Sequence, residues 1–438
     1  MEARDLINVV PHLNSYKWYG KVTRVVGLMI ESKGPQASIG DLCYIHLGKL
    51  QKTKVMAEVV GFREEHVLLM PINGTGEISP GSLVEATRHP LQIKVGSGLI
   101  GKIIDGCGQP LDRSPLPDGL SSFPTDNDPP NPLERPRITE PMSIGIRSID
   151  SVLTVGKGQR VGIFAGSGVG KSTLLSMIIK NSDADLNIIA LIGERGREVR
   201  DFIERDLGEE GLKKSIVVVA TSDQPALMRV KGAMTATAIA EYFRNQGMHV
   251  NLMMDSVTRF AMAQREIGLA VGEPPTTKGY TPSVFAMLPR LLERSGTSAN
   301  GSITAFYTVL VDGDDLNEPI SDAVRGILDG HFVLDRKLAN KGQFPAINVL
   351  KSVSRVMHDI VSQNHLVAAE RLRTLLSTYY ESEDLINIGA YKRGSSREVD
   401  LAIQAYPNII SFLKQGIKED SNLVKAVTML QEQIGKGE

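Results

Sequence analysis

The sequence predicts an α/β protein with a mostly parallel sheet covered by helices, a small β-barrel or sandwich before it and a small helical domain after it. Three observations predict this class. Short β-branched runs fill residues 17–90, apolar strands alternate with helical stretches over residues 145–350, and apolar residues three and four apart dominate after residue 356. A chain of 438 residues has room for two or three domains. We set the domain bounds at residues 1–90, 91–355 and 356–438.

The strand-like runs of the first domain are GKVTRVVGLMIES, KVMAEVVGF and HVLLMPI. Prolines then crowd between Pro110 and Pro141, and because proline lacks an amide donor and fixes φ, we expect no regular structure there. The expected strands of the second domain are RVGIFA, LNIIALIG, SIVVVATS, VNLMMD and ITAFYTVLVD. In the third domain, NHLVAAERLRTLLSTYY and REVDLAIQAYPNIISFLKQ have helical spacing.

The composition is that of an ordinary globular protein, with 42% hydrophobic and 23% charged residues and a formal net charge of -1. Nucleic acid is not an expected partner, because its recognition requires a basic excess. No apolar run reaches about 18 residues, and the first residues carry acid where a signal peptide carries base, so we expect a cytoplasmic protein. Cys43 and Cys107 lack disulfide or metal-ligand spacing and are expected to be buried thiols.

The segment AGSGVGKS, from Ala165 to Ser172, predicts a phosphate-binding loop. Its glycines let successive backbone amides point at phosphate oxygens, and the helix that follows adds its positive dipole end. The alternative is a loop that only packs, but the strand before it, the GKS within it and the helix after it favour phosphate. We expect ATP and Mg²⁺ here, with Lys171 on the outer phosphates and Ser172 on the magnesium. The expected nucleotide contacts are Gly166, Ser167, Gly168, Val169, Gly170, Lys171, Ser172 and Thr173.

Two carboxylates end other expected strands, and in a parallel sheet these ends meet at one edge. Asp255 closes NLMMD and has the form of a residue that holds magnesium through water; the alternative is a cap of the next helix. Glu194, in ALIGERGREV, is a candidate general base for the attacking water. Its neighbour Arg195 is counted with the catalytic candidates because its charge would keep Glu194 ionised. The alternative for Glu194 is a surface ion pair with Arg195 or Arg197.

Phosphoryl transfer also needs a cation to stabilise its transition state. Spacing alone does not select one of the many arginines. Arg355, in FPAINVLKSVSRVM, lies far along the chain from the phosphate loop, so it is a candidate to act from a neighbouring subunit. A salt bridge at the domain boundary is the alternative, and the residues leave both open.

Several long blocks together resemble one family: AGSGVGKS, GERGREV, TSDQPALMR, MMDSVTRFAMAQREIG and PAINVLKSVSR. The chain resembles the catalytic subunits of rotary F-type ATP synthases and their relatives that drive type III protein export. GEPPTTKGYTPSVFAMLPRLLERSG and LINIGAYKRGSSREVDLAI look more like the export branch, and within it the bacterial flagellar ATPases. The resemblance implies a RecA-like P-loop core between an N-terminal β-barrel and a C-terminal helical domain, with six copies forming a homohexameric ring.

The resemblance also implies roles for individual residues. Glu194 would activate water, and Arg355 would act as a finger across the subunit interface. Phe344 would stack on adenine, and a second adenine contact would fall near Tyr391. The segment VGEPPTTKGYTPSVF, residues 271–285, would line the central pore.

The function implied is a Mg-dependent ATPase that energises export of flagellar proteins. Its implied partners are a dimeric regulatory protein at the N-terminus, a central stalk protein, a membrane export gate and complexes of export substrates with chaperones. It would act at the cytoplasmic face of the inner membrane. The regulator would dock on the first residues, which place four apolar side chains at helical spacing around Pro11: Leu6, Val9, Val10 and Leu13. The alternative is a loose terminus.

Other functions are weighed against this one. A virulence-type secretion ATPase and a rotary ATP synthase subunit share the blocks quoted above. A ring subunit that binds ATP without hydrolysing it has no need for a base such as Glu194. An RNA or DNA translocase should carry aromatic and basic residues interleaved in its barrel, and this barrel has no basic cluster.

Overall fold

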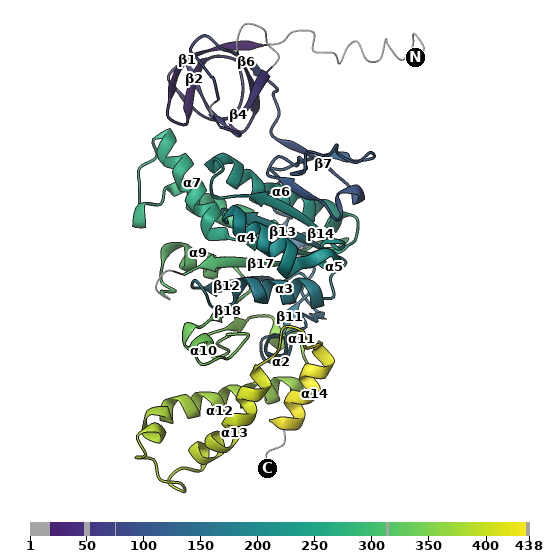
Figure 1. Cartoon of the computed structure of the whole chain (residues 1–438), viewed down its shortest axis with the longest axis vertical. Coiled ribbons are helices and arrows are strands. Elements are labelled where there is room, and N and C mark those ends of the chain that lie inside the picture. Colours follow the sequence, from purple (N-terminus) through teal and green to yellow (C-terminus); the bar gives the residue numbers. More distant parts are fainter. Residues whose placement is uncertain (1–17, 48–52, 75, 312–314, 435–438) are drawn as a thin grey trace.

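The computed structural model describes residues 18–47, 53–74, 76–311 and 315–434, and it forms three tiers (Figure 1). The first tier is a closed six-stranded barrel with strand order β1-β2-β5-β4-β3-β6. Because β1 pairs with both β2 and β6, the sheet closes on itself, which decides between barrel and sandwich. The barrel strands are β1 Tyr19–Val26, β2 Met29–Lys33, β3 Leu42–Leu47, β4 Thr53–Arg63, β5 His66–Pro71 and β6 Leu83–Ala86.

The middle tier is a nine-stranded sheet with order β19-β18-β12-β17-β15-β13-β14-β8 and β16 paired to β17. Every pairing from β18 to β8 is parallel, so the predicted mostly parallel sheet is confirmed. The five expected strands are β12 Arg160–Ala165, β13 Leu186–Ile192, β14 Ser215–Ala220, β15 His249–Asp255 and β17 Ser302–Leu310. Four further strands complete it: β8 Ile103–Asp105, β16 Gly296–Thr297, β18 Gly330–Leu334 and β19 Val353–Ser354.

Helices cover both faces of this sheet and form two hydrophobic cores. One core includes α6 to α9, and the other includes α2, α3 and the C-terminal helices. The helices of the middle tier are α2 Arg147–Val152, α3 Lys171–Asn181, α4 Gly196–Asp201, α5 Gly208–Leu212, α6 Ala226–Asn245, α7 Val257–Val271, α8 Pro282–Leu292, α9 Pro319–Ile327, α10 Arg336–Asn340 and α11 Met357–Ile360. A π-helix, Phe202–Leu207, joins α4 to α5, and short 3-10 turns occur at Ser97–Leu99, Pro132–Glu134 and Thr277–Gly279.

The third tier contains α12 Gln363–Asn387, α13 Arg397–Leu413 and α14 Leu423–Gln433. The predicted fold class, a barrel followed by an α/β nucleotide core and a helical domain, is confirmed. No helix within the described ranges is long and apolar enough to cross a membrane. Cys43 and Cys107 are buried free thiols, as expected, and burial raises the pKa of each to about 12.

The expectation of no regular structure between Pro110 and Pro141 is wrong in three places, one of which is the 3-10 turn at Pro132–Glu134. Strand β9, Ser121–Pro124, pairs with β7, Gln92–Val95, and β10, Pro141–Met142, pairs with β11, Val155–Gly156. Both ladders have only two strands, and their prolines stand at strand ends. A missing amide donor there removes little of the ladder.

Candidate nucleotide site

The predicted phosphate loop lies between β12, which ends at Ala165, and α3, which begins at Lys171. Gly168 and Gly170 have φ of 77° and 88°, a left-handed conformation that glycine adopts without strain. Within the described chain no side chain caps α3, so the first amides of the helix are left for a ligand. The local backbone therefore has the form that an anion-binding loop requires.

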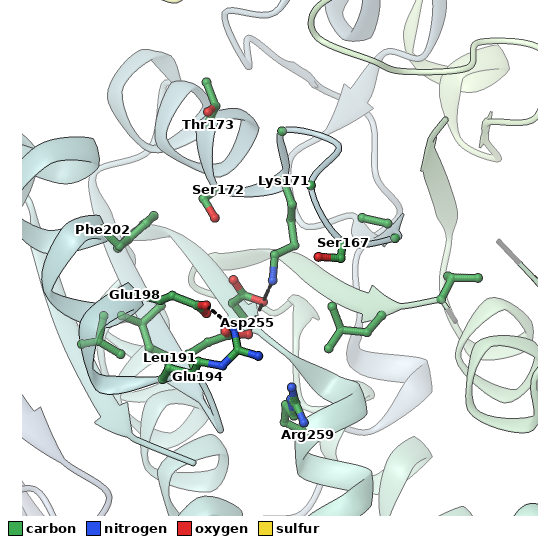
Figure 2. Close-up of a pocket in the computed structure, with 18 residues that line it drawn as sticks. Ser167, Lys171, Ser172, Thr173, Leu191, Glu194, Glu198, Phe202, Asp255 and Arg259 are labelled. Carbon is green, nitrogen blue, oxygen red and sulfur yellow. Dashed lines mark hydrogen bonds and ion pairs between the residues drawn. The ribbon is translucent and has the colours of Figure 1, made fainter. Parts of the chain in front are cut away.

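This loop borders a cavity of about 540 Å³ at the carboxyl edge of the sheet. Figure 2 shows Lys171 pointing toward Asp255, with Glu194 and Glu198 nearby. Val169 is 1% exposed and packs in the core beneath the loop, so only its backbone is on the ligand side. The predicted residues that line the cavity are Gly166, Ser167, Gly168, Gly170, Lys171, Ser172, Thr173, Glu194, Arg195 and Asp255.

Lys171 stands between two carboxylates. Its Nζ lies 2.5 Å from Asp255 Oδ1 and 3.5 Å from Glu194 Oε1. Burial acts to lower the pKa of Lys171, but the charges of Asp255 and Glu194 outweigh it, and the net shift is upward. Thr308 Oγ1 donates a hydrogen bond of 2.7 Å to the same Asp255 oxygen, which fixes the carboxylate. The two carboxylates thus stabilise the ammonium form of Lys171 at the centre of the site.

The alternative role for Asp255, capping the next helix, is taken by its neighbour. The Ser256 side chain accepts a hydrogen bond from the Arg259 amide at the start of α7. Asp255 is therefore free to face the cavity with Lys171.

Glu194 is not the surface ion pair considered as its alternative role. Arg195 donates instead to Glu198, over 2.7 Å, and the Arg195 side chain is 74% exposed. Burial, followed by the charge of Asp255, raises the pKa of Glu194 to about 7. A carboxyl group with a pKa near neutrality can accept a proton and release it again at physiological pH.

The oxygen atoms at the site suit a hard cation bound together with phosphate. Ser172 and Asp255 offer a hydroxyl and a carboxylate, and phosphate oxygens and water commonly complete the shell of Mg²⁺ in such sites. Across the ranges that the structure covers, no group of three or more His, Cys, Asp or Glu side chains is arranged to hold a metal alone. The residues therefore fit Mg²⁺ with a nucleotide better than a dedicated protein cage.

Besides Val169, three predicted residues do not line the cavity. Phe344 is 47% exposed and lies at the loop, since a Cβ placed on Gly170 would be 3.5 Å from its ring. Arg355 is exposed next to β19, where its Nη2 donates to the Arg325 carbonyl over 3.3 Å. Tyr391 donates to the Ser396 carbonyl and to Asp400, both at 3.0 Å, within the connection between α12 and α13.

The salt bridge considered for Arg355 is not formed: among the described residues no carboxylate pairs with its guanidinium. Its side chain remains at the surface of the subunit. A neighbouring chain could approach it there.

Arg259 is a cavity residue that the sequence reasoning missed. Its Nε is buried without a hydrogen-bond partner in the described part of the chain. Gly193 makes room for it, because a Cβ at Gly193, where φ is 71°, would lie 2.7 Å from the Arg259 Cβ. The available signal was its position in the first turn of the helix that follows Asp255.

Together, the strand–loop–helix phosphate site, the parallel sheet and the two flanking domains define a P-loop nucleotide-binding protein. Family models agree with this class along the chain. Residues 22–88 match the β-barrel domain of the ATP synthase alpha/beta family, and residues 145–354 match its nucleotide-binding domain. Residues 361–432 match the C-terminal domain of the type III secretion ATPase EscN.

The chain belongs to the flagellum-specific ATP synthases, type III secretion ATPases related to the alpha and beta subunits of F-type ATP synthase. It is 68% identical to the flagellum-specific ATP synthase of Bacillus subtilis, over 100% of both chains. The assembled ATPase EscN of enteropathogenic E. coli superposes with a TM-score of 0.89 at 46% identity, covering 95% of this chain and 100% of EscN. EscN in complex with its central stalk EscO gives a TM-score of 0.87 at 45% identity, with the same coverage. The resemblance noted in the sequence is confirmed, and the chain is an ATPase.

Proposed function

We propose that this ATPase hydrolyses Mg·ATP in the cavity beside Lys171 and that a ring of identical subunits uses the reaction to energise export of flagellar proteins. The observation that carries the proposal is the position of the Lys171 ammonium between Asp255 and Glu194, beside an uncapped helix N-terminus. This arrangement places a cation, a metal-binding carboxylate and a candidate base around the space where phosphates would bind.

Each residue has a distinct part in this proposal. Amides of the phosphate loop and Lys171 bind the phosphates, while Ser172 and Asp255 hold Mg²⁺. Glu194 takes a proton from the attacking water, and Arg195 fixes Glu198 beside it. The bound metal supplies charge neutralisation on the phosphate oxygens.

The ring is proposed as a homohexamer, in which Arg355 of one subunit reaches the cavity of its neighbour. Its exposure outside its own cavity supports this arrangement, since a residue used across an interface must lie at the surface of its own chain. Phe344, beside Gly170, is suited to stack on adenine. Tyr391 remains a weaker proposal for the second adenine contact, because its hydroxyl is bound within its own connection.

The proposed partners follow from the family. EscN forms a complex with its central stalk EscO, and we propose an equivalent stalk protein here, with segment 271–285 facing the pore. A membrane export gate, complexes of export substrates with chaperones and a dimeric regulator complete the set, at the cytoplasmic face of the inner membrane. The proposed docking site of the regulator, residues 1–17, lies outside the described residues.

The alternatives have less support. Identity is 68% to a flagellum-specific ATP synthase but 50% to a type III secretion ATPase and 46% to EscN, which favours flagellar export over virulence secretion. A silent ring subunit or an ATP synthase subunit is disfavoured because one chain carries Lys171, Glu194, Asp255 and Arg355. Nucleic acid translocation is disfavoured by a net charge of -1.

The direct test is complementation: the gene for this protein is supplied to a bacterium whose own flagellar ATPase gene has been deleted. The wild-type gene should restore export of filament protein, and the gene with Lys171→Ala should not. Purified wild-type protein should release phosphate from ATP only with Mg²⁺, and a chelator should stop it. Phosphate release with chelator present, or export by the Lys171→Ala protein, would contradict the proposal.

A further inference from the structure

Helix α9 is attached at its two ends to two different functional segments of the chain. It packs in the core through Ile320 and Val324, both 0% exposed, and contacts β12 and β17 of the sheet (Figure 1). With nine residues it is about 13 Å long. Because the helix is short and packed in this way, we expect it to move as a rigid unit. A displacement of its N-terminal end would then also displace its C-terminal end.

The C-terminal end of α9 holds Arg355. The Leu328 amide bonds to the Val324 carbonyl, and the Asp329 amide turns away to bond to Arg160. The Arg325 carbonyl, one of the last of the helix, therefore accepts from the Arg355 guanidinium, over 3.3 Å. A cation is favoured at this negative end of the helix dipole.

A second carbonyl, that of Asp329, also holds Arg355 in position. The Arg355 amide donates to the Asp329 carbonyl over 3.0 Å. Asp329 is itself held by Arg160, whose Nε and Nη2 donate to its carboxylate over 2.9 Å and 3.0 Å. The last turn of α9 thus holds the guanidinium of Arg355, and the turn that follows α9 holds its backbone.

The N-terminal end of α9 is attached to the segment between α7 and α8. Glu318, the residue before the helix, accepts a hydrogen bond from the Tyr280 hydroxyl over 3.4 Å. Tyr280 is 3% exposed, and its carbonyl accepts from the Thr276 amide and hydroxyl, both at 2.7 Å. Tyr280 therefore anchors an otherwise exposed loop, residues 274–278, to the start of α9.

We propose that Tyr280 and Glu318 are positioning residues for Arg355: through α9 they connect the exposed loop 274–278 to the arginine that completes the neighbouring subunit's site. The proposal rests on the proposed function for the role of Arg355, but the connection itself does not. A contact made by the loop would reach the neighbour's site through a continuous series of packed and hydrogen-bonded groups.

Three variants and a matched control test the connection in the assembled protein. Tyr280→Phe and Glu318→Ala both remove the hydrogen bond, whereas Glu318→Gln keeps an acceptor oxygen. The Glu318 side chain makes no cap hydrogen bond to an amide of α9, but its Oε2 also accepts from the Ser321 hydroxyl over 3.4 Å, a contact that Glu318→Ala removes as well. The control, Tyr307→Phe, removes another buried tyrosine hydroxyl, which hydrogen-bonds to the Ser295 hydroxyl over 2.8 Å.

Amide hydrogen exchange of residues 353–357 reports on the connection without any catalysis. We expect Tyr280→Phe and Glu318→Ala to speed this exchange and to lower kcat roughly 3- to 10-fold with KM unchanged, while Glu318→Gln and Tyr307→Phe stay near wild type. Unchanged exchange in Tyr280→Phe, or an equal change in Tyr307→Phe, would overturn the connection. Faster exchange with unchanged kcat would support the connection and contradict the role of Arg355 in the proposed function.

Discussion

The ammonium of Lys171 lies 2.5 Å from the carboxylate of Asp255, whose same oxygen also accepts from Thr308. The groups that the proposed function assigns to phosphate and to Mg²⁺ thus compensate each other's charge in this structure. With Mg·ATP bound as proposed, Lys171 would exchange Asp255 for phosphate oxygens, and Asp255 would help to hold Mg²⁺. The exchange keeps both buried charges compensated, which avoids the large cost of an unpaired buried charge.

Replacing Lys171 with Ala should abolish ATP hydrolysis, because it removes the charge that meets the outer phosphates. We expect turnover to fall by roughly 100-fold or more. Phosphate release is measured beside thermal unfolding of the same protein. A folded variant that kept more than a small fraction of wild-type turnover would show that this loop is not the catalytic site.

Replacing Glu194 with Gln should separate binding from turnover. Glutamine keeps the shape and the hydrogen bonding of glutamate but does not accept the proton of the attacking water. ATP affinity should be retained, while turnover falls by roughly 100-fold or more. If affinity and turnover fell together, Glu194 would be a structural residue instead.

The pH dependence of turnover should follow Glu194, whose pKa is raised to about 7 by burial and by Asp255. The ionised form is the base, so activity is full above this pKa and is lost as the pH falls through it. We expect kcat/KM for ATP, which reports the pKa of the free site, to drop about tenfold between pH 8 and pH 6. The residual activity of Glu194→Gln should lack this step, and a wild-type profile that is flat over the range would argue against Glu194 as the base.

Arg259 should contribute to nucleotide turnover, because its guanidinium lines the cavity and its Nε has no partner among the described residues. We expect Arg259→Ala to lower kcat/KM by roughly 10- to 100-fold, the range for a charge-assisted hydrogen bond. The matched control is Arg229→Ala, which removes an ion pair with Glu266 and does not line the cavity. Equal losses in the two variants would mean that Arg259 acts only through folding.

The sequence predicted the central sheet and most of the cavity because both are encoded locally. Strands β12, β13 and β14 are continuous apolar runs, and in a parallel sheet the residues at their ends meet at one edge. Strands β8 and β18 were missed: β8 has three residues, and β18 is a five-residue run that becomes a strand by pairing with β12. Their strand character comes from tertiary pairing, which a local pattern does not contain.

The residues of the site also fall into two groups, those that local sequence patterns predict and those that only the fold brings to the cavity. Lys171 and Asp255 belong to local patterns and meet in the fold, whereas Arg259 enters the cavity only because Gly193, on another strand end, leaves room for it. Phe344 lies near the phosphate loop, whereas Tyr391 is bound to Ser396 and Asp400 in the helical domain, and the adenine contacts of both residues stay predictions. The position of Arg355 relative to a neighbouring cavity depends on how the subunits assemble, and neither a local sequence pattern nor the fold of one subunit gives it.

That assembly is tested most directly by mixing two inactive proteins, one with Lys171→Ala and one with Arg355→Ala. If Arg355 acts across the interface, random mixed rings contain some interfaces in which an intact phosphate loop faces an intact arginine, roughly one quarter at equal amounts. We predict that phosphate release reappears on mixing and scales with the proportion of such interfaces. No release from rings that are shown to be mixed would contradict a site shared between subunits.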